Sequence, residues 1–137
     1  MKKILTLIVL AVTSNLLAQE NSFDLVIKVE NITSQEGKVR IALYDSEDNF
    51  LDESIKSGVV EASQGSVLYK FTNLSSGTYA ISLFHDEDGD GKLNSNFMGI
   101  PSEPYAFSNN AKGMFGPPDF DECKFEMTGT KEITIDL

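Results

Sequence analysis

Hydrophobic and polar residues alternate along most of the chain after the first twenty positions. In the segment 23–30, FDLVIKVE, apolar side chains occupy every second position, and Asp24, Lys28 and Glu30 lie on the opposite face. The same period of two recurs in the segments 38–45, 66–74 and 78–86. Successive residues of a strand point to opposite faces, so this period predicts half-buried β-strands. The last of these segments is apolar on both faces and is expected to be a central strand.

Shorter segments at 55–60, 123–127 and 131–137 complete the predicted sheets. Turn-rich tracts separate the strands at intervals of about ten residues, which is typical of an all-β protein. No segment has a convincing helical period. We therefore predict an antiparallel β-sandwich of about seven strands, of the immunoglobulin-like kind, with one long ordered loop. Residues 20–137 are expected to form this single domain, since roughly 118 residues suffice for one core.

The long loop is the tract from about residue 86 to residue 122, where the alternation stops and Gly, Pro, Asn and Asp are frequent. Loops of this length are usually functional or disordered. Large apolar residues favour an ordered loop that packs on the sandwich. They are Phe97, Met98, Ile100, Tyr105, Phe107, Met114, Phe115 and Phe120.

Two interpretations of the aromatic residues in this loop are open. Tyr105, Phe107 and Phe115 can form an apolar platform that binds a sugar or a peptide. Alternatively, the loop packs on itself and covers one end of the sandwich. The general rule that aromatic clusters are more often core than site favours the second interpretation.

The first 19 residues have the features of a secretory signal peptide. Lys2 and Lys3 precede an apolar run over 4–12, and small and polar residues follow up to Ala18. The run is too short for a transmembrane segment, which needs about 20 apolar residues. We expect residues 1–19 to be cleaved and the domain to be exported to the periplasm or the extracellular space.

The composition narrows the chemistry. The chain has 21 acidic and 11 basic residues and a formal net charge of -10. Such a surface repels nucleic acid and anionic lipid head groups, so no nucleic-acid partner is expected. His85 is the only histidine and Cys123 the only cysteine, which excludes an internal disulfide and makes a zinc site of the usual kind improbable. We expect Cys123 to be buried and inert.

The segment 84–94, FHDEDGDGKLN, places three aspartates at alternate positions and a glycine directly after the third. Ca²⁺ binds six to eight oxygen ligands, many of them carboxylates. Alternate carboxylates in a turning loop can point at one ion, and a glycine permits the backbone turn. The segment matches the first nine positions of an EF-hand-type loop. The predicted ligands are the side chains of Asp86, Asp88, Asp90 and Asn94 and the backbone carbonyl of Lys92.

The match to an EF-hand ends after the ninth position. The twelfth position, which requires glutamate, is Phe97, and a predicted strand precedes the loop instead of a helix. A calcium loop on a β scaffold therefore needs a further ligand, and Glu103, Asp119 and Asn96 are the candidates. We select Glu103. The other interpretation is an acidic turn with Asp-Gly turn chemistry and no bound ion.

The same tract carries a family resemblance. The run from FHDEDGDGKLN through MGIPSEPYAFSNNA to FGPPDF resembles the domain of unknown function 2141, a family of small secreted bacterial proteins. The preceding NLSSGTYAISLFHD resembles the strand, turn and strand that enter the acidic loop in this family. The chain departs from the family's motif at Ala106, where glycine is expected. The resemblance covers nearly all of residues 20–137.

The resemblance implies a secreted β-sandwich similar to the prealbumin-like modules of carboxypeptidase regulatory domains, which are generally non-catalytic. It implies no established activity. Prealbumin-like enzymes of purine breakdown rely on several histidines and a C-terminal Tyr-Arg-Gly-Ser. This chain has one histidine and ends in TIDL, so that activity is not expected.

Three functions fit these observations. We predict a non-enzymatic module with a calcium-stabilised loop that binds a ligand or partner at the cell envelope, either an envelope protein or a glycan. The first alternative is a hydrolase in which Glu103 and Asp86 act as acid and base, with or without His85. It lacks a nucleophile motif such as GxSxG, and acidic pairs arise easily by chance in this composition. The second is a purely structural envelope protein with a solvated acidic loop.

Overall fold

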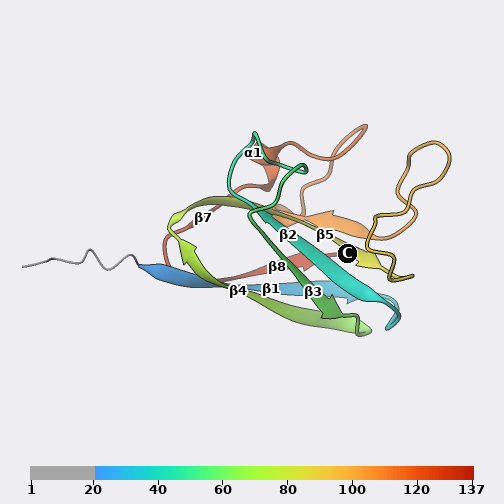
Figure 1. Ribbon diagram of the computed structural model, residues 1–137, viewed down its shortest axis with the longest axis horizontal. Coiled ribbons are helices and arrows are strands. Elements are labelled where there is room, and N and C mark those ends of the chain that lie inside the picture. Colours follow the sequence, from blue (N-terminus) through green and yellow to red (C-terminus); the bar gives the residue numbers. More distant parts are fainter. Residues whose placement is uncertain (1–20) are drawn as a thin grey trace, which may run out of the picture.

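The computed structural model describes residues 21–137, and the predicted signal peptide at 1–19 lies outside the described residues. The described chain consists of eight strands and two short helical turns (Figure 1). The strands are β1 (Ser22–Ile32), β2 (Lys38–Tyr44), β3 (Lys56–Glu61), β4 (Gly65–Ser75), β5 (Gly77–Asp86), β6 (Tyr105–Phe107), β7 (Phe125–Met127) and β8 (Lys131–Asp136). The helical turns are the 3₁₀ turn η1 (Ser108–Asn110) and the helix α1 (Phe120–Cys123).

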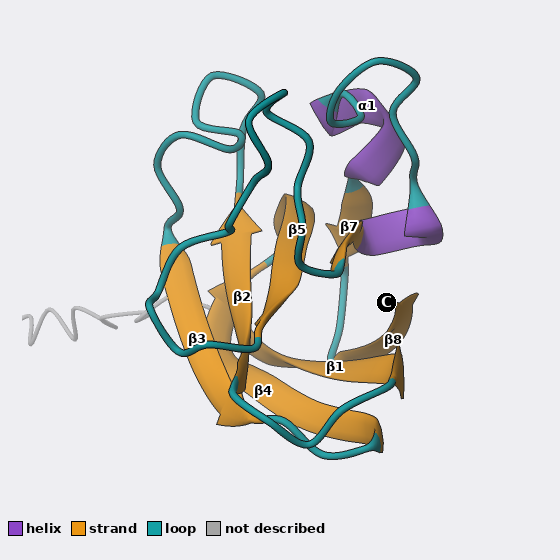
Figure 2. Cartoon of the chain, turned by 90° about the vertical axis from the view of Figure 1, so that its right-hand side faces the viewer, coloured by secondary structure: helices purple, strands orange, loops and turns teal. Residues whose placement is uncertain are grey.

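The strands form two sheets that face each other, which confirms the predicted β-sandwich (Figures 1 and 2). The smaller sheet has the order β4-β1-β8, and the larger has the order β3-β2-β5-β6, with β7 also paired to β5. The strand predicted to be central, β5, has three partners, namely β2, β6 and β7. Most pairs are antiparallel, but β8 lies parallel to β1.

The core lies between the sheets and follows the alternation of the sequence. On β5, the side chains of Ile81 and Leu83 are buried between the sheets, and Leu83 lies opposite Ile41 of β2. On β1, Leu25, Ile27 and Val29 are fully buried in the same cluster. The period of two in the sequence is therefore the origin of the core.

Two features of the chain end were not predicted. The strands β7 and β8 pair with β5 and β1 and not with each other, so the chain passes from one sheet to the other between them. The four-residue helix α1 is closed at its start by a capping box, in which Asp119 and Glu122 exchange side-chain and backbone hydrogen bonds. A helix this short leaves no period in the sequence.

A second apolar cluster covers the outer face of the larger sheet, the face turned away from β1, β4 and β8. It consists of Ala80, Phe107, Phe120 and Cys123, with Phe50 packed against it. The loops 45–55, 87–104 and 111–119 all rise on this side of the molecule (Figures 1 and 2). This outer face therefore brings together segments that are far apart in the sequence.

Polar side chains of η1 hold these segments together. The Ser108 hydroxyl accepts a hydrogen bond from the Ile81 amide at 2.9 Å and donates one to the Cys123 carbonyl at 2.5 Å. The Asn109 amide group donates to the carbonyls of Glu122 and Lys124 at 3.1 and 2.8 Å. These bonds satisfy backbone groups of β5 and of the segment 122–124 and fix α1 on β5.

The prediction that the apolar residues of the long loop pack on the sandwich is correct for only some of them. Phe107 and Phe120 are buried, and Tyr105 is half-exposed with its ring 6.0 Å from that of Phe107. Phe115, proposed as a third member of a platform, is fully exposed. The other exposed apolar residues of the loop are Leu93, Phe97, Met98, Ile100 and Met114.

A turn at Asn96 accompanies the exposure of Met98 and Ile100. The side-chain oxygen of Asn96 accepts hydrogen bonds from the amides of Met98 and Ile100, at 2.9 and 3.1 Å. Such a turn satisfies the backbone locally and directs the apolar side chains outward.

Candidate metal centre

Asp86 ends β5 and belongs to the outer face of the larger sheet. Its side chain is fully buried, and its Oδ2 accepts hydrogen bonds from Arg40 Nε at 2.5 Å and from the Gly91 amide at 2.9 Å. Gly91 has a φ of 82°, a left-handed conformation that favours glycine. The loop therefore turns back on Asp86 just where the sequence places a glycine, as the alternate aspartates and Gly91 predicted.

A second turn, at Gly37, also contacts Asp86. Gly37 has a φ of 72°, and a Cβ atom at this residue would lie 2.0 Å from the carbonyl oxygen of Asp86. Only glycine therefore fits at this position without a shift of the backbone. The turn at Gly37 therefore lies directly against the backbone of Asp86.

The other oxygen of Asp86, Oδ1, is buried and has no hydrogen-bond partner among the described residues. Burial disfavours the charged form of this carboxyl, but the Arg40 guanidinium and the Gly91 amide outweigh it. The pKa of Asp86 is therefore held below its ordinary value, and the group is a carboxylate at neutral pH. A buried carboxylate oxygen without a donor is costly, since buried polar atoms are almost always paired.

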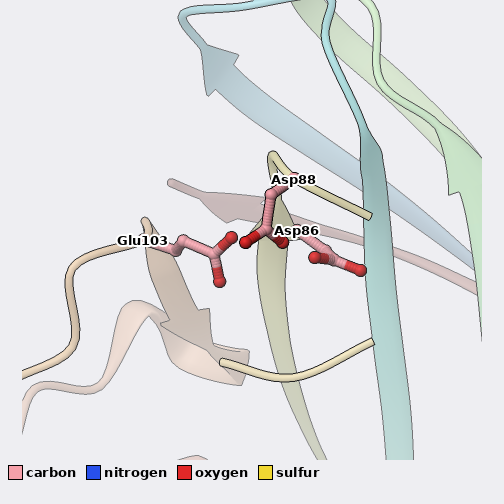
Figure 3. A group of neighbouring side chains, drawn as sticks. All are labelled: Asp86, Asp88 and Glu103. Atoms are coloured by element: carbon pink, nitrogen blue, oxygen red, sulfur yellow. The ribbon is translucent and has the colours of Figure 1, made fainter. Parts of the chain in front are cut away.

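Two further carboxylates lie beside Asp86. One oxygen from each of Asp86, Asp88 and Glu103 lies within 4.8 Å of the others. Figure 3 shows the carboxylates of Asp88 and Glu103 facing each other next to Asp86. Arg40 is the cation paired with this group through Asp86. Three carboxylates against one guanidinium leave an excess of negative charge, which a bound cation would balance.

The loop backbone fixes the orientation of Glu103. This side chain is buried, its Oε1 accepts a hydrogen bond from the Glu87 amide at 3.1 Å, and its Oε2 accepts one from the Asn94 amide at 3.0 Å. Glu103 therefore ties the start of the loop to its middle. Of the three candidates for the completing ligand, it is the one that the structure brings to Asp86 and Asp88.

Asp88 is exposed and is also oriented by the loop. Its Oδ1 accepts a hydrogen bond from the Asp90 amide at 3.1 Å, and its Oδ2 accepts one from Asn94 Nδ2 at 2.6 Å. Asn94 thus turns its amide nitrogen toward the carboxylates. The predicted ligand Asn94 lies at the site, and here it acts as a hydrogen-bond donor.

The remaining predicted ligands lie outside the group of three carboxylates. Asp90 Oδ1 accepts a hydrogen bond from the Lys92 amide at 2.8 Å, in a turn of its own. Asn96 supports the next turn with its side-chain oxygen, and Asp119 caps α1. The structure therefore groups a subset of the acidic residues instead of the complete EF-hand-type set.

Arg40 is the site residue that the sequence interpretation missed. It lies on β2, opposite Phe84 of β5, and shares the outer face with Asp86. The alternation of the segment 38–45 does place Arg40 on the polar face. No pattern in the sequence links that face to an aspartate 46 residues away.

His85, which the hydrolase alternative adds to Glu103 and Asp86, and the single cysteine, Cys123, are both buried. His85 is buried, and its Nε2 lies 2.6 Å from the carbonyl oxygen of Glu36. Cys123 is fully buried, and burial, with the nearby Glu122 and Asp119, raises its pKa to about 11. The thiol is therefore protonated at neutral pH and is a poor nucleophile.

Comparison with known proteins decides the family. A sequence model of the family described as "Uncharacterized protein conserved in bacteria (DUF2141)" matches residues 27–135. The chain belongs to this bacterial family. No curated protein and no solved structure shows significant similarity to it, so the prealbumin-like relationship stays a prediction. Among the described residues of this DUF2141 protein, no helix has the length and apolar character to cross a membrane.

Proposed function

We propose that this DUF2141 protein is an exported, non-catalytic binding module whose long loop is closed by Ca²⁺. The ligands are one oxygen each from Asp86, Asp88 and Glu103. The observation that carries the proposal is Asp86 Oδ1, a buried oxygen that has no hydrogen-bond partner within residues 21–137 and belongs to a carboxylate held ionised by Arg40.

The donor set fits calcium better than other metals. All three donors are carboxylates, which suit hard cations, whereas zinc favours cysteine and histidine. Asp88 is exposed, so water can supply further oxygens to reach the six to eight that Ca²⁺ requires. Asn94 lies beside Asp88 and can add its amide oxygen after rotation of the amide group.

The structural role of the ion follows from where these groups lie. Asp86 ends β5, Asp88 lies in the loop, and Glu103 lies just before β6. An ion that binds all three ties both ends of the loop to the sheet. Because it binds only the folded arrangement, it stabilises the folded state. The function that this calcium site supports best is to hold the loop in one orientation for a binding partner.

The test is thermal unfolding in about 10 mM calcium, in magnesium and in EDTA. For a dissociation constant of about 10⁻⁴ M, calcium should stabilise the protein by about 2.7 kcal/mol, which raises the melting temperature by roughly 10 °C. Magnesium should have a smaller effect, because it demands a stricter octahedral geometry. Equal melting temperatures in calcium and EDTA would refute the proposal.

Substitution of single carboxylates tests which residues bind the ion. Asp88→Asn and Glu103→Gln should each abolish most of the calcium-induced shift, because each removes one charged donor. Asp90→Asn is the matched control, since this carboxylate lies in the same loop and accepts its hydrogen bond from Lys92. If Asp90→Asn removes the shift as completely as Asp88→Asn, the ligand set is the EF-hand-type one instead of the three grouped carboxylates.

A further inference from the structure

An apolar groove lies on the outer face of the larger sheet, between the loops. Its volume is about 480 Å³. Gly99 and Pro101 line it from the loop 87–104, and Gly116 and Pro117 line it from the loop 111–119. Leu51 contributes from the loop 45–55. The floor consists of outer-face residues of the sheet, namely Tyr44, Ser82, Phe84, Tyr105 and Phe107.

The loops that line the groove carry large apolar side chains in full contact with water. Phe97 and Met98 are 98% and 69% exposed, and Met114 and Phe115 are 91% and 102% exposed. Single exposed apolar residues are normal on a protein surface, but a group on neighbouring loops marks an interaction site. We call these four residues the loop tips.

The three loops that line the groove belong to acidic segments of the chain. The segments 45–53 and 86–124, which contain all three loops, carry thirteen of the 21 acidic residues and three of the 11 basic ones. One of these three, Lys124, is paired with Asp121 at 2.9 Å. The rest of the chain is nearly balanced in charge. The net acidity of the protein is thus largely the acidity of the segments that contain these three loops. Eleven of their thirteen acidic residues are exposed, and we call these eleven the acidic rim. The other two, Asp86 and Glu103, are buried and belong with Asp88 to the proposed calcium site.

We propose that this groove and the loop tips bind a basic polypeptide segment with bulky apolar side chains. The inference rests on the proposed function, that of a binding module, and names the chemical class of its partner. Apolar side chains of the segment enter the groove and contact the loop tips, while its Lys and Arg residues face the acidic rim. Charge complementarity of this kind speeds association and rejects acidic partners.

Two other occupants fit the charge less well. An anionic membrane surface is repelled by the same acidic rim. A second copy of the chain would bring two acidic faces together, which costs free energy when like charges face each other. A basic polypeptide is attracted by the same acidic residues. It is therefore the occupant that the charge distribution favours.

The experiment uses a fluorescein-labelled peptide of alternating Lys and Phe, with fluorescence anisotropy as the readout. A peptide with Glu in place of Lys and one with Ser in place of Phe are the matched probes. The purified protein should bind the Lys/Phe peptide at least tenfold more tightly than either matched probe. Raised salt should weaken the binding, because the rim is exposed.

Substitutions that keep the net charge distinguish binding at the groove from non-specific attraction to an acidic protein. Phe97→Ser combined with Phe115→Ser should weaken binding at least tenfold without a change in net charge. Leu68→Ser is the control, since Leu68 is 61% exposed on β4 in the other sheet and should leave binding unchanged. Equal loss in the control and the double variant, or no loss in either, would overturn the proposal.

The same samples distinguish the other outcomes. Sedimentation with phosphatidylglycerol vesicles that depends on the loop tips, together with no peptide binding, would overturn the proposal in favour of a lipid surface. A concentration-dependent dimer that the double variant abolishes would overturn it in favour of self-association. The calcium-induced shift in melting temperature should survive in the double variant. Absent peptide binding with an intact shift therefore refutes the docking surface alone, and leaves the calcium site standing.

Discussion

The two faces of β5 are built on different physical principles. Its inner face carries Ile81 and Leu83, which are buried among apolar side chains from both sheets. Its outer face carries Ser82, Phe84 and Asp86, which meet a cavity, polar loops and an ion pair. The inner face is stabilised by close packing of apolar side chains. The outer face depends on hydrogen bonds and on the balance of buried charges.

The difference between the two faces indicates which part of this fold can hold a functional site. At Ile81 and Leu83 the inner face is surrounded by apolar side chains, so a cavity or an unpaired polar group introduced there costs stability directly. The outer face accepts a buried carboxylate because Arg40 and the Gly91 amide compensate it. Chemistry and recognition are therefore expected on the outer face, and mutations on the two faces should have distinguishable effects.

The largest effect is expected on the inner face. Ile81→Ala should lower the free energy of unfolding by about 3 kcal/mol, because it removes buried methyl groups and leaves a cavity between the sheets. Urea-induced unfolding, followed by circular dichroism, measures the change. The calcium-induced stabilisation should be the same as in the wild type. A variant that loses its calcium response would show that the two faces are not independent.

A smaller effect is expected for the ion pair on the outer face. Arg40→Met should lower the free energy of unfolding in EDTA by about 2 kcal/mol, because the Asp86 charge stays buried without its cation. The loss should be smaller in saturating calcium, since the bound ion supplies positive charge to the same carboxylate. Urea unfolding with and without calcium checks both statements.

The matched control for this prediction adds a second substitution. Combining Arg40→Met with Asp86→Asn removes the uncompensated charge, so the double variant should recover part of the stability that Arg40→Met loses. A double variant that is less stable than Arg40→Met alone would contradict the assignment of the cost to a buried charge.

The smallest effect on stability at neutral pH concerns Cys123 in the second apolar cluster. Its thiol is fully buried, and burial raises its pKa to about 11. It should therefore react with iodoacetamide at pH 8 at least about 100-fold more slowly than in the unfolded chain, since both the access to the thiol and its thiolate fraction are reduced. Mass spectrometry in buffer and in urea measures the two rates. Equal rates would mean that the cluster opens readily.

The same raised pKa sets the sign of an alkaline effect. The contribution of the protonated thiol to stability is fully present below its unfolded pKa, near 9, and is lost as the pH rises toward 11. Cys123→Ala should therefore lose less stability than the wild type between these pH values. The opposite order would contradict the shift.

Much of the fold follows from the sequence, for an identifiable reason. Period-two alternation fixes which residues of a strand face the core, and this is why the buried residues of β1, β2 and β5 were predictable. The convergence of Asp86, Asp88 and Glu103 was also predicted in part. Alternate carboxylates in a loop need only a turn to approach one another, and Gly91 marked that turn.

Other features depend on contacts that leave no local pattern. The parallel register of β8 with β1 is set by packing across the whole sheet. Arg40 reaches Asp86 because β2 and β5 are neighbours, which no spacing in the sequence encodes. The exposure of Phe97 and Phe115 was unexpected, because large apolar residues usually mark a core.

The ends of the acidic loop have a practical consequence for engineering. The loop leaves β5 and re-enters on β6, and these strands are antiparallel neighbours in which Phe84 lies opposite Tyr105. A hydrogen bond of 2.8 Å from the His85 amide to the Pro104 carbonyl joins the two strands at the point where the loop departs. The intervening stretch is thus an exchangeable cassette. A two-residue hairpin turn, or a loop grafted from another sequence, can be spliced between these strands while the sandwich is kept as a scaffold.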